Sequence, residues 1–248
     1  MRILAVIQAR MNSTRLPQKI MTPLCGKPML WHIVNRVNRS GLIHQVVIAT
    51  SLKPEDDIVE SFANENNFFI WRGSQDNVLE RFYDCATFYK ADILVRLTAD
   101  NALVDAGIID AGITYFQKHT YDYVYYREGL PIGMACEIFT YDALKRAYEN
   151  ASDAECLEHV TPYLYKNPHL FHVERVGCIG ENLGFLRWTM DTESDKELIT
   201  QIYNCIYTRK NNFTYRDILE EYKIHPGWTQ LNSSVEQVAV TYRGESTL

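Results

Sequence analysis

The hydrophobic and polar positions in the first half of the chain alternate between two periods. Short apolar, β-branched runs bounded by polar residues, which are typical of buried strands, lie at 2–8, 45–50, 68–72 and 92–98. Apolar side chains at helical spacing lie between these runs, within the segments 30–37, 58–62 and 78–86. This β-α-β-α-β-α-β order predicts a mainly parallel sheet with helices on both faces, and therefore a three-layer α/β/α fold.

The pattern changes in the second half of the chain. Strand-like residues flank a segment rich in glycine and proline, which predicts a small β-rich excursion at about 121–140. Helical periodicity returns after it, and we expect helices at 141–150, 155–166 and 193–207. Because no linker, repeat or low-complexity tract separates the halves, we expect one domain over residues 1–223 and a polar tail over 224–248.

The charge balance and the cysteines narrow the class of protein. The chain has 31 acidic and 25 basic side chains, and its formal net charge is -6. Because nucleic-acid binding needs a basic surface, we expect no nucleic-acid partner. No apolar run approaches the ~18–20 residues that span a bilayer, so we expect no membrane span. The cysteines are scattered without a CxxC pair, which indicates buried thiols in a reducing cytoplasm: Cys25, Cys85, Cys136, Cys156, Cys178 and Cys205.

The loop that follows the first predicted strand carries a cluster of cations. Arg10, Arg15 and Lys19 fall within it, next to small hydroxyl and amide side chains. In open α/β sheets ligands bind beyond the carboxyl ends of the strands, and cationic side chains together with backbone N–H groups suit a triphosphate there. The loop has neither the P-loop pattern GxxxxGKS/T nor the GxGxxG of a dinucleotide site. The alternative interpretation is a solvated, charged loop without a ligand.

A longer motif in this loop resembles a known signature. It reads Ile7-Gln8-Ala9-Arg10-Met11-Asn12-Ser13-Thr14-Arg15-Leu16-Pro17-Gln18-Lys19. It is similar to the A-R-x-x-S-x-R-L-P-x-K of the cytidylyltransferases that activate acidic sugars, the CMP-sialic acid and CMP-Kdo synthetases. It resembles more closely the branch named after the spore coat polysaccharide biosynthesis protein SpsF. Further matches follow in order at 46–51, 72–81, 95–100, 158–163 and 191–192.

The resemblance implies a Rossmann-like nucleotidyltransferase fold related to the GT-A fold, and a homodimer formed through the β-rich excursion. With the chemistry of the loop it assigns three catalytic candidates, Arg15, Lys19 and Asp100. The nucleotide-binding candidates are Gln8, Ala9, Arg10, Ser13, Arg15, Lys19, Ser74, Asp76, Arg81 and Thr98. Asp100 and Asp191 are the expected ligands of Mg²⁺, the expected cofactor.

Several of these residues have a structural alternative. Asp100 comes directly after a strand and offers the hard oxygen that Mg²⁺ prefers, but it could cap its loop instead. Asp191 could cap the helix expected at 193–207, and that role is compatible with metal binding. Ser74 or Asp76 could cap the helix that follows them, with Arg81 paired to a neighbouring acid.

The acceptor side departs from the family pattern. SpsF-like proteins usually read T-A-D-C-P-L and D-G-L-D-V-E, where this chain has Thr98-Ala99-Asp100-Asn101-Ala102-Leu103 and Ile132-Gly133-Met134-Ala135-Cys136-Glu137. Two acidic side chains that could orient an acceptor are therefore missing. Glu137, Glu158 and His159 remain as candidate acceptor contacts, although a histidine beside apolar helix residues is equally well explained by packing.

The expected reaction is attack by an acceptor oxygen on the α-phosphate of CTP, with Mg²⁺-dependent release of pyrophosphate. The partners would be CTP and a small acidic or sugar-like acceptor, in surface polysaccharide biosynthesis. One alternative is a nucleotide-sugar glycosyltransferase of GT-A-like fold, for which Asp100 lacks the D-x-D context because Thr98 takes the first position. The other alternative is a nucleotide-binding protein without turnover that partners another enzyme.

Overall fold

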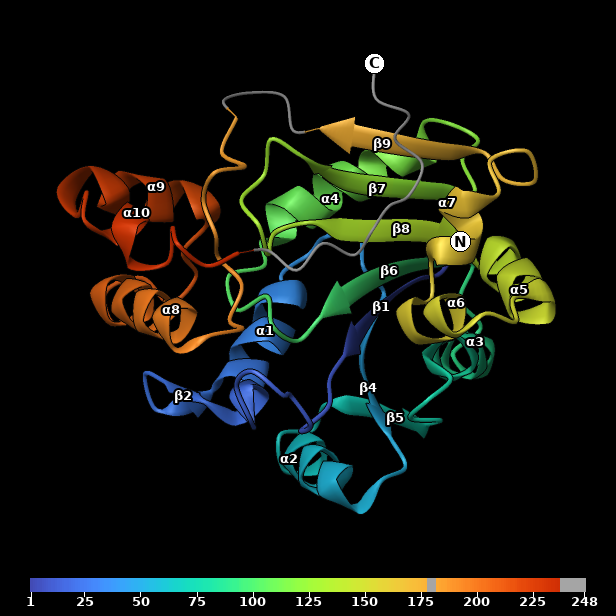
Figure 1. Cartoon of the computed structure of the whole chain (residues 1–248), viewed down its shortest axis with the longest axis horizontal. Helices are drawn as coiled ribbons and strands as arrows, with labels where there is room; N and C mark the ends of the chain where they lie inside the picture. The colour runs from blue at the N-terminus through green and yellow to red at the C-terminus, as the bar shows by residue number, and fades with distance from the viewer. Residues whose placement is uncertain (178–181, 237–248) are drawn as a thin grey trace.

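A seven-stranded mixed sheet forms the centre of the protein in a computed structural model that describes residues 1–177 and 182–236 (Figure 1). The strands lie in the order β5-β4-β1-β6-β8-β7-β9. Their bounds are β1 Ile3–Gln8, β4 Gln45–Ser51, β5 Phe69–Gly73, β6 Ile93–Thr98, β7 Tyr123–Glu128, β8 Cys136–Thr140 and β9 Val173–Gly177. β1, β4, β5 and β6 are parallel, β8 runs antiparallel to β6 and β7, and β9 is parallel to β7. The predicted α/β fold with a mainly parallel sheet is confirmed.

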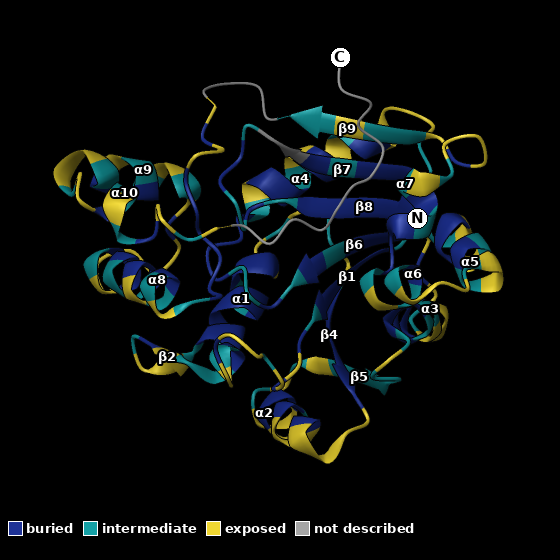
Figure 2. Ribbon diagram, in the orientation of Figure 1, coloured by how far each residue is buried: buried dark blue, intermediate teal, exposed yellow. Residues whose placement is uncertain are grey.

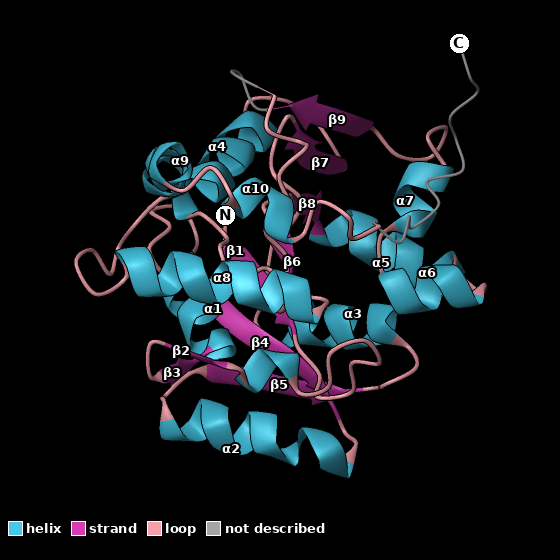
Figure 3. Cartoon of the chain, turned by 60° about the vertical axis from the view of Figure 1, so that its left-hand side comes forward, coloured by secondary structure: helices cyan, strands magenta, loops and turns pink. Residues whose placement is uncertain are grey.

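Helices cover both faces of this sheet (Figures 1 and 3). Their bounds are α1 Met29–Val37, α2 Asp57–Glu65, α3 Val78–Phe88, α4 Ala106–Gln117, α5 Tyr141–Asn150, α6 Ala154–His159, α7 Pro162–Lys166, α8 Glu193–Ile206, α9 Tyr215–Ile224 and α10 Trp228–Leu231. The shorter elements are the 3-10 turns Lys19–Met21 and Pro54–Asp56 and the small pair β2 Pro23–Leu24 and β3 Lys27–Pro28.

The two faces of the sheet carry separate apolar cores. Alternate residues of β1 point to opposite faces, so that Ile3, Ala5 and Ile7 lie in one cluster and Leu4 and Val6 in the other. α1, α2, α4 and α8 contribute to the first cluster, and α3 and α5 contribute to the second. Figure 2 shows the inner strands buried and the helices with one buried and one exposed face. The three-layer arrangement is thus the one that the hydrophobic pattern predicts.

One predicted helix is in fact two. Instead of a single helix over 155–166, α6 ends at His159 and α7 begins at Pro162. Pro162 has no backbone N–H, so it cannot continue the hydrogen bonds of α6, and it lies in the first turn of α7, where proline is favoured. Val160 takes a positive φ of 72°, and the carbonyl of His159 accepts the N–H of Thr161 (2.9 Å) in a tight bend. The single-helix prediction was wrong because apolar periodicity does not register such a break.

The last helices pack together on one side of the sheet. α8, α9 and α10 lie side by side (Figures 1 and 3). Past Ile224, where the sequence predicts a polar tail, the chain continues into α10, and Trp228 and Asn232 are buried. The tail residues 237–248, like Cys178, lie outside the described residues. None of the helices in the described ranges is long and apolar enough to cross a membrane.

Candidate active site

The loops that follow β1 and β6 leave the sheet at the same edge. The two strands pair in register to their last residues, with Gln8 opposite Thr98. Ala9 donates to the carbonyl of Ala49 (3.0 Å), and Ala99 donates to the carbonyl of Gln8 (3.0 Å). This edge holds the carboxyl ends of the parallel strands, where ligands bind in open α/β sheets. The predicted nucleotide loop therefore starts at the ligand-binding edge.

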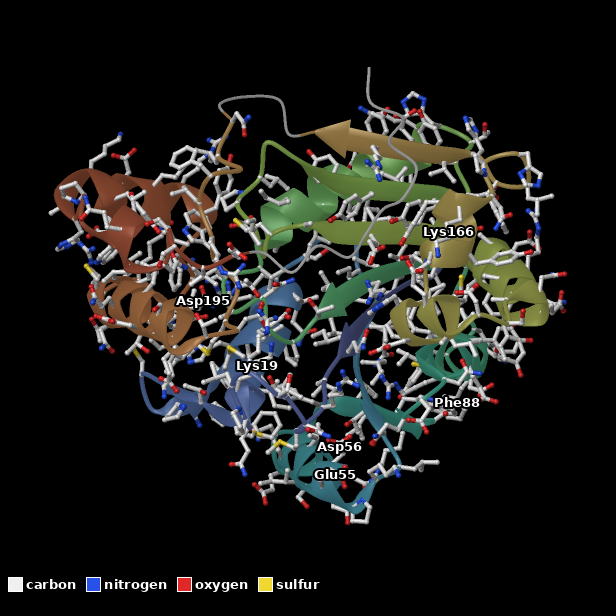
Figure 4. All side chains as sticks on the ribbon, in the orientation of Figure 1. Lys19, Glu55, Asp56, Phe88, Lys166 and Asp195 are labelled. Atoms are coloured by element: carbon white, nitrogen blue, oxygen red, sulfur yellow. The ribbon has the colours of Figure 1, made fainter. Side chains whose placement is uncertain are left out.

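A buried carboxylate anchors this loop, and sequence reasoning missed it. Asp56 Oδ1 accepts the N–H of Met11 (2.7 Å), and its Oδ2 accepts the backbone N–H (3.2 Å) and the hydroxyl (2.5 Å) of Ser51. Asp56 thereby ties the loop after β1 to the end of β4, and Figure 4 shows it beside α2. The signal that could have found it is an acidic residue just beyond the second parallel strand, at the same edge of the sheet.

Lys19, which Figure 4 labels, contacts two carboxylates at this edge of the sheet. Its Nζ lies 2.7 Å from Asp191 Oδ1 and 3.4 Å from Asp100 Oδ2, and Arg15 Nη2 lies 3.2 Å from Asp191 Oδ2. Arg15 is the most exposed of the four side chains at 44%, followed by Asp100 (27%), Lys19 (13%) and Asp191 (9%). The candidate catalytic residues and metal ligands therefore converge, although 172 positions separate Lys19 from Asp191.

Backbone contacts hold the segments of the two carboxylates together. The carbonyl of Asp100 accepts the N–H of Met190 (2.8 Å), which joins the loop after β6 to the segment before α8. Thr192, and not Asp191, is the N-cap of α8, where it forms a capping box. The helix-capping alternative for Asp191 was therefore wrong, and its side chain is directed to Lys19 instead.

The hydroxyl groups of the nucleotide-binding candidates make local hydrogen bonds. Ser13 Oγ accepts the N–H of Leu16 (3.4 Å) within the loop. Thr98 Oγ1 donates to Asp100 Oδ1 (2.5 Å) and accepts from Asn101 Nδ2 (3.1 Å). Thr98, the last residue of β6, thus orients the side chain of Asp100.

Arg81 is buried beneath the segment that follows β5. Its Nη1 donates to the carbonyl of Ser74 (3.0 Å), whereas Nε and Nη2 have no hydrogen-bond partner among the described residues. Burial first, and then repulsion from Arg10, lower the pKa of Arg81 to about 10. A Cβ added at Gly73 would lie 2.9 Å from Cγ of Arg81, so only glycine leaves room for this approach.

The capping alternative for Ser74 and Asp76 is also not what the structure shows. Asn77 caps α3 by accepting the N–H of Glu80 (2.9 Å), and Ser74 Oγ accepts the N–H of Asn77 (3.0 Å). Asp76 is exposed at the surface of this turn. Ser74 and Asp76 therefore precede the helix cap and lie in the turn above Arg81.

Glu137 lies inside the fold and is bound by protein groups. It is buried, it pairs with Arg96, and its Oε1 accepts the hydroxyls of Tyr123 (2.8 Å) and Thr161 (2.5 Å). Arg96 also donates to Gln8 Oε1 (3.2 Å) through Nη2. The charge of Arg96 on an otherwise apolar strand is thus compensated by a structural ion pair, and this network reaches the start of the nucleotide loop.

The other two acceptor candidates lie on α6. Glu158 Oε1 is 4.0 Å from Arg10 Nη2, and both side chains are largely exposed. His159, at the end of the same helix, is partly buried. α6 therefore faces the cationic loop and places Glu158 next to Arg10. Glu137, on β8, does not reach this surface.

A second group of potential metal ligands lies away from this edge, between α8 and α9. Cys205 Sγ is 3.1 Å from Glu221 Oε2 and 3.7 Å from His225 Nε2. Arg209 pairs with the other oxygen of Glu221 and approaches Cys205 Sγ at 3.7 Å. Its guanidinium balances the carboxylate, so hydrogen bonds and an ion pair account for this cluster without a metal.

Comparison with protein families decides among the functions that this geometry allows. A model of the cytidylyltransferase family matches residues 4–246. The chain belongs to the cytidylyltransferase family. It is accordingly an enzyme, a CTP-dependent nucleotidyltransferase, as the motif in the first loop predicts.

Similar proteins share most of their length with this cytidylyltransferase. The spore coat polysaccharide biosynthesis protein SpsF of Bacillus subtilis is 35% identical over 207 residues, which cover 81% of this chain and 86% of that protein. An uncharacterized protein of Methanocaldococcus jannaschii is 33% identical over 246 residues, covering 96% and 97%. The solved structure of a cytidylyltransferase from Leptospira borgpetersenii matches with a TM-score of 0.87 at 29% identity, covering 96% of this chain and 99% of that one. The resemblance to the SpsF-like branch is confirmed.

Proposed function

We propose that this enzyme transfers CMP from CTP to a small acidic, sugar-like acceptor, with Mg²⁺ as cofactor and pyrophosphate as the leaving group. The observation that carries the proposal is the position of Lys19 Nζ between Asp100 (3.4 Å) and Asp191 (2.7 Å) at the carboxyl edge of the sheet. Two carboxylates that converge on one cation, beside a loop rich in arginine, suit a metal–triphosphate complex. The similarity to SpsF supports a place in polysaccharide biosynthesis.

Asp100 and Asp191 would hold the Mg²⁺. They fit this ion because both are hard oxygen donors, they come from two separate segments, and they already share one positive charge. When bound, Mg²⁺ neutralises the charge of the phosphates. The partial exposure of Asp100 leaves this site open to a ligand from solvent.

Arg15 and Lys19 would stabilise the pyrophosphate as it leaves. Asp191 forms ion pairs with both cations in the structure, and phosphate oxygens are equivalent anionic partners for them. Asp56 keeps the loop in place by holding the N–H of Met11. Catalysis would then rest on positioning and on charge stabilisation, and it needs no covalent protein intermediate.

Arg81, with Ser74 and Asp76, is our candidate for recognition of the base. Its unpartnered Nε and Nη2 are donors, and cytosine offers a carbonyl oxygen and a ring nitrogen as acceptors. A buried cation with unused donors lowers stability unless a ligand accepts from it.

The variant Arg81→Met tests this assignment. It should weaken CTP binding about tenfold or more. Its melting temperature should be unchanged or higher, since the substitution removes a charge that burial penalises. A lowered melting temperature with unchanged CTP affinity would assign Arg81 to the fold instead.

The acceptor would bind next to α6. Glu158 and His159 lie there, with Arg10 across from Glu158 (4.0 Å), and the cationic side chain suits an acidic acceptor. Glu137 is left out of this proposal because its oxygens are bound by Arg96, Tyr123 and Thr161.

Thermal denaturation with CTP, ATP, GTP and UTP, each with and without Mg²⁺, tests the donor assignment. A ligand that binds only the folded state at ~100-fold saturation raises the free energy of unfolding by about 2.7 kcal/mol. We expect the largest rise in melting temperature with CTP, and a further rise with Mg²⁺. Equal shifts with all four nucleotides would remove the base assignment, and no shift with any of them would remove the triphosphate site.

A further inference from the structure

A buried polar network lies under the candidate metal ligand Asp191. Its members are Arg187, Asp195 and Asn232, which come from the segment before α8, from α8 itself and from the end of α10. Asp195 is completely buried and Arg187 nearly so. Figure 4 places Asp195 close to α8, on the same side of the sheet as Lys19. None of these three residues lies in the motif matches described in the sequence, of which the last is 191–192.

Asp195 fixes the backbone that carries Asp191. Its Oδ2 accepts the N–H groups of Asp191 and Thr192, both at 3.0 Å. Its Oδ1 accepts from Arg187 Nε (2.8 Å) and from Asn232 Nδ2 (2.8 Å), and Asn232 also donates to the carbonyl of Arg187 (2.9 Å). The carboxylate thus accepts bonds from four groups and holds three segments of the chain in one arrangement.

Arg187 also reaches the side chain of Asp191 and distinguishes its two oxygens. Arg187 Nη2 donates to Asp191 Oδ2 (3.1 Å), and Arg15 Nη2 is 3.2 Å from the same oxygen. The other oxygen, Oδ1, is the one that contacts Lys19 Nζ (2.7 Å). Since Arg187 is itself fixed by Asp195, the carboxylate of Asp191 cannot rotate without breaking a buried charge-assisted hydrogen bond.

We infer that Arg187 is a positioning residue that presents Oδ1 of Asp191 to the metal site, and that Asn232 couples the chain after α10 to this carboxylate. The inference rests on the proposed function, because it takes Asp191 to be a ligand of Mg²⁺. Neither Arg187 nor Asn232 needs to touch the nucleotide or the metal for this effect. Partners that orient a metal ligand from behind typically change metal affinity 10- to 100-fold when they are replaced.

The variant Arg187→Lys separates orientation from charge. A lysine keeps the positive charge beside Asp195, but its ammonium is a point charge that cannot serve both carboxylates as the planar fork of arginine does. Removing the charge altogether would leave the buried carboxylate of Asp195 without a cationic partner and would destabilise the fold. Asn232→Ala is the second variant, since it keeps both charges and removes only the two bonds of the amide.

CTP affinity would be measured by isothermal titration calorimetry at a series of free Mg²⁺ concentrations and in EDTA. Mg²⁺ is expected to increase the CTP affinity, and the quantity to compare is the Mg²⁺ concentration at which half of this increase is reached. In Arg187→Lys we expect this concentration to rise about 10- to 100-fold. The CTP affinity in EDTA should equal that of the wild type. Asn232→Ala should shift it in the same direction by a smaller factor, and it decides the outcome if Arg187→Lys does not fold. Wild-type Mg²⁺ dependence in the folded variants would overturn the inference.

Two further variants separate this inference from the proposed function. In Asp191→Asn, Mg²⁺ should no longer increase the CTP affinity. If Mg²⁺ still increases it, Asp191 is not a metal ligand, and the positioning role of Arg187 fails as well. If Asp191→Asn loses this increase and Arg187→Lys keeps the wild-type Mg²⁺ dependence, only the positioning role fails. Arg209→Lys is the matched control, because Arg209 also pairs with a carboxylate, Glu221, but lies away from the edge of the sheet.

Discussion

The two carboxylates of the candidate metal site are held in different ways. Asp100 is 27% exposed, and its side chain is oriented by Thr98, the last residue of β6, two positions earlier. Asp191 is 9% exposed, and its position depends on Arg187, Asp195 and a residue of the last described segment, Asn232. One carboxylate is thus placed by the end of a strand and the other by a buried network.

This difference predicts which of the two carboxylates can be substituted without loss of stability. A partly exposed carboxylate bound by its neighbours can change with little effect on the fold. A carboxylate joined to a buried ion pair carries stability as well as chemistry, because its loss leaves a buried donor unsatisfied.

Replacing each carboxylate by its amide should give the largest effect and test the comparison directly. Asp100→Asn and Asp191→Asn should both raise the Mg²⁺ requirement for CTP binding by more than about 100-fold, since even indirect changes cost 10- to 100-fold. Asp191→Asn should also lower the free energy of unfolding by about 1–3 kcal/mol, whereas Asp100→Asn should change it by no more than about 0.5 kcal/mol. Urea denaturation measures the loss of stability, and equal losses in the two variants would show that the buried network does not make Asp191 more important to the fold than Asp100.

Lys19 should show an effect on nucleotide binding that metal can partly offset. Lys19→Ala should weaken CTP binding about 10- to 100-fold, the equivalent of one charge-assisted hydrogen bond, measured by calorimetry. It also leaves Asp100 and Asp191 without their shared cation, so its melting temperature should fall and should recover on addition of Mg²⁺ alone. Arg15→Ala is the control for the change in melting temperature and its recovery with Mg²⁺, because Arg15 contacts only Asp191 of the two carboxylates and is largely exposed. If Mg²⁺ does not raise the melting temperature of Lys19→Ala, no metal binds between the two carboxylates.

The smallest expected effect is on the acid stability of the network under Asp191. Burial would raise the pKa of Asp195, but hydrogen bonds from Arg187, Asn232 and the backbone of Asp191 outweigh it and lower the pKa below its usual value. Because the folded pKa lies below the unfolded value of about 3.9, this group contributes stability above that pH, and the contribution is lost as the pH falls through the folded pKa. Urea midpoints measured from about pH 6 down to about pH 3 should therefore fall less steeply for Asp195→Asn than for the wild type. Parallel pH profiles would show that Asp195 is not ionised in the folded protein.

The parts of the site that sequence predicts are those encoded locally. The loop from Gln8 to Lys19 and Asp100 follow directly from strands whose apolar pattern is clear, and the carboxyl edge of a parallel sheet places them together. Asp56 and Asn232 were missed because each contacts a residue 45 positions away, Met11 and Arg187, and apolar periodicity does not specify the distant partner of a polar side chain.

Alternatives that depend on side-chain geometry could not be settled from the sequence either. The choice between Asp191 and Thr192 as the cap of α8 depends on which oxygen faces the first turn. The sequence makes Glu137, which follows a Gly/Pro segment, a candidate acceptor contact. Its strand, however, pairs with the interior strand that carries Arg96, and Glu137 lies opposite Arg96 in the register. Strand order and register, which periodicity does not specify, decided its burial.

The reaction that we propose for this edge of the sheet is the transfer of CMP from CTP to an acidic sugar with the help of Mg²⁺. The most direct test is the release of pyrophosphate from CTP by the purified enzyme, with and without Mg²⁺, in the presence of a panel of nonulosonic and octulosonic acids. We predict release with at least one of these acids, dependent on Mg²⁺ and lost in Asp100→Asn. Tight CTP binding without release for any acid of the panel, or release that persists in Asp100→Asn, would contradict the account.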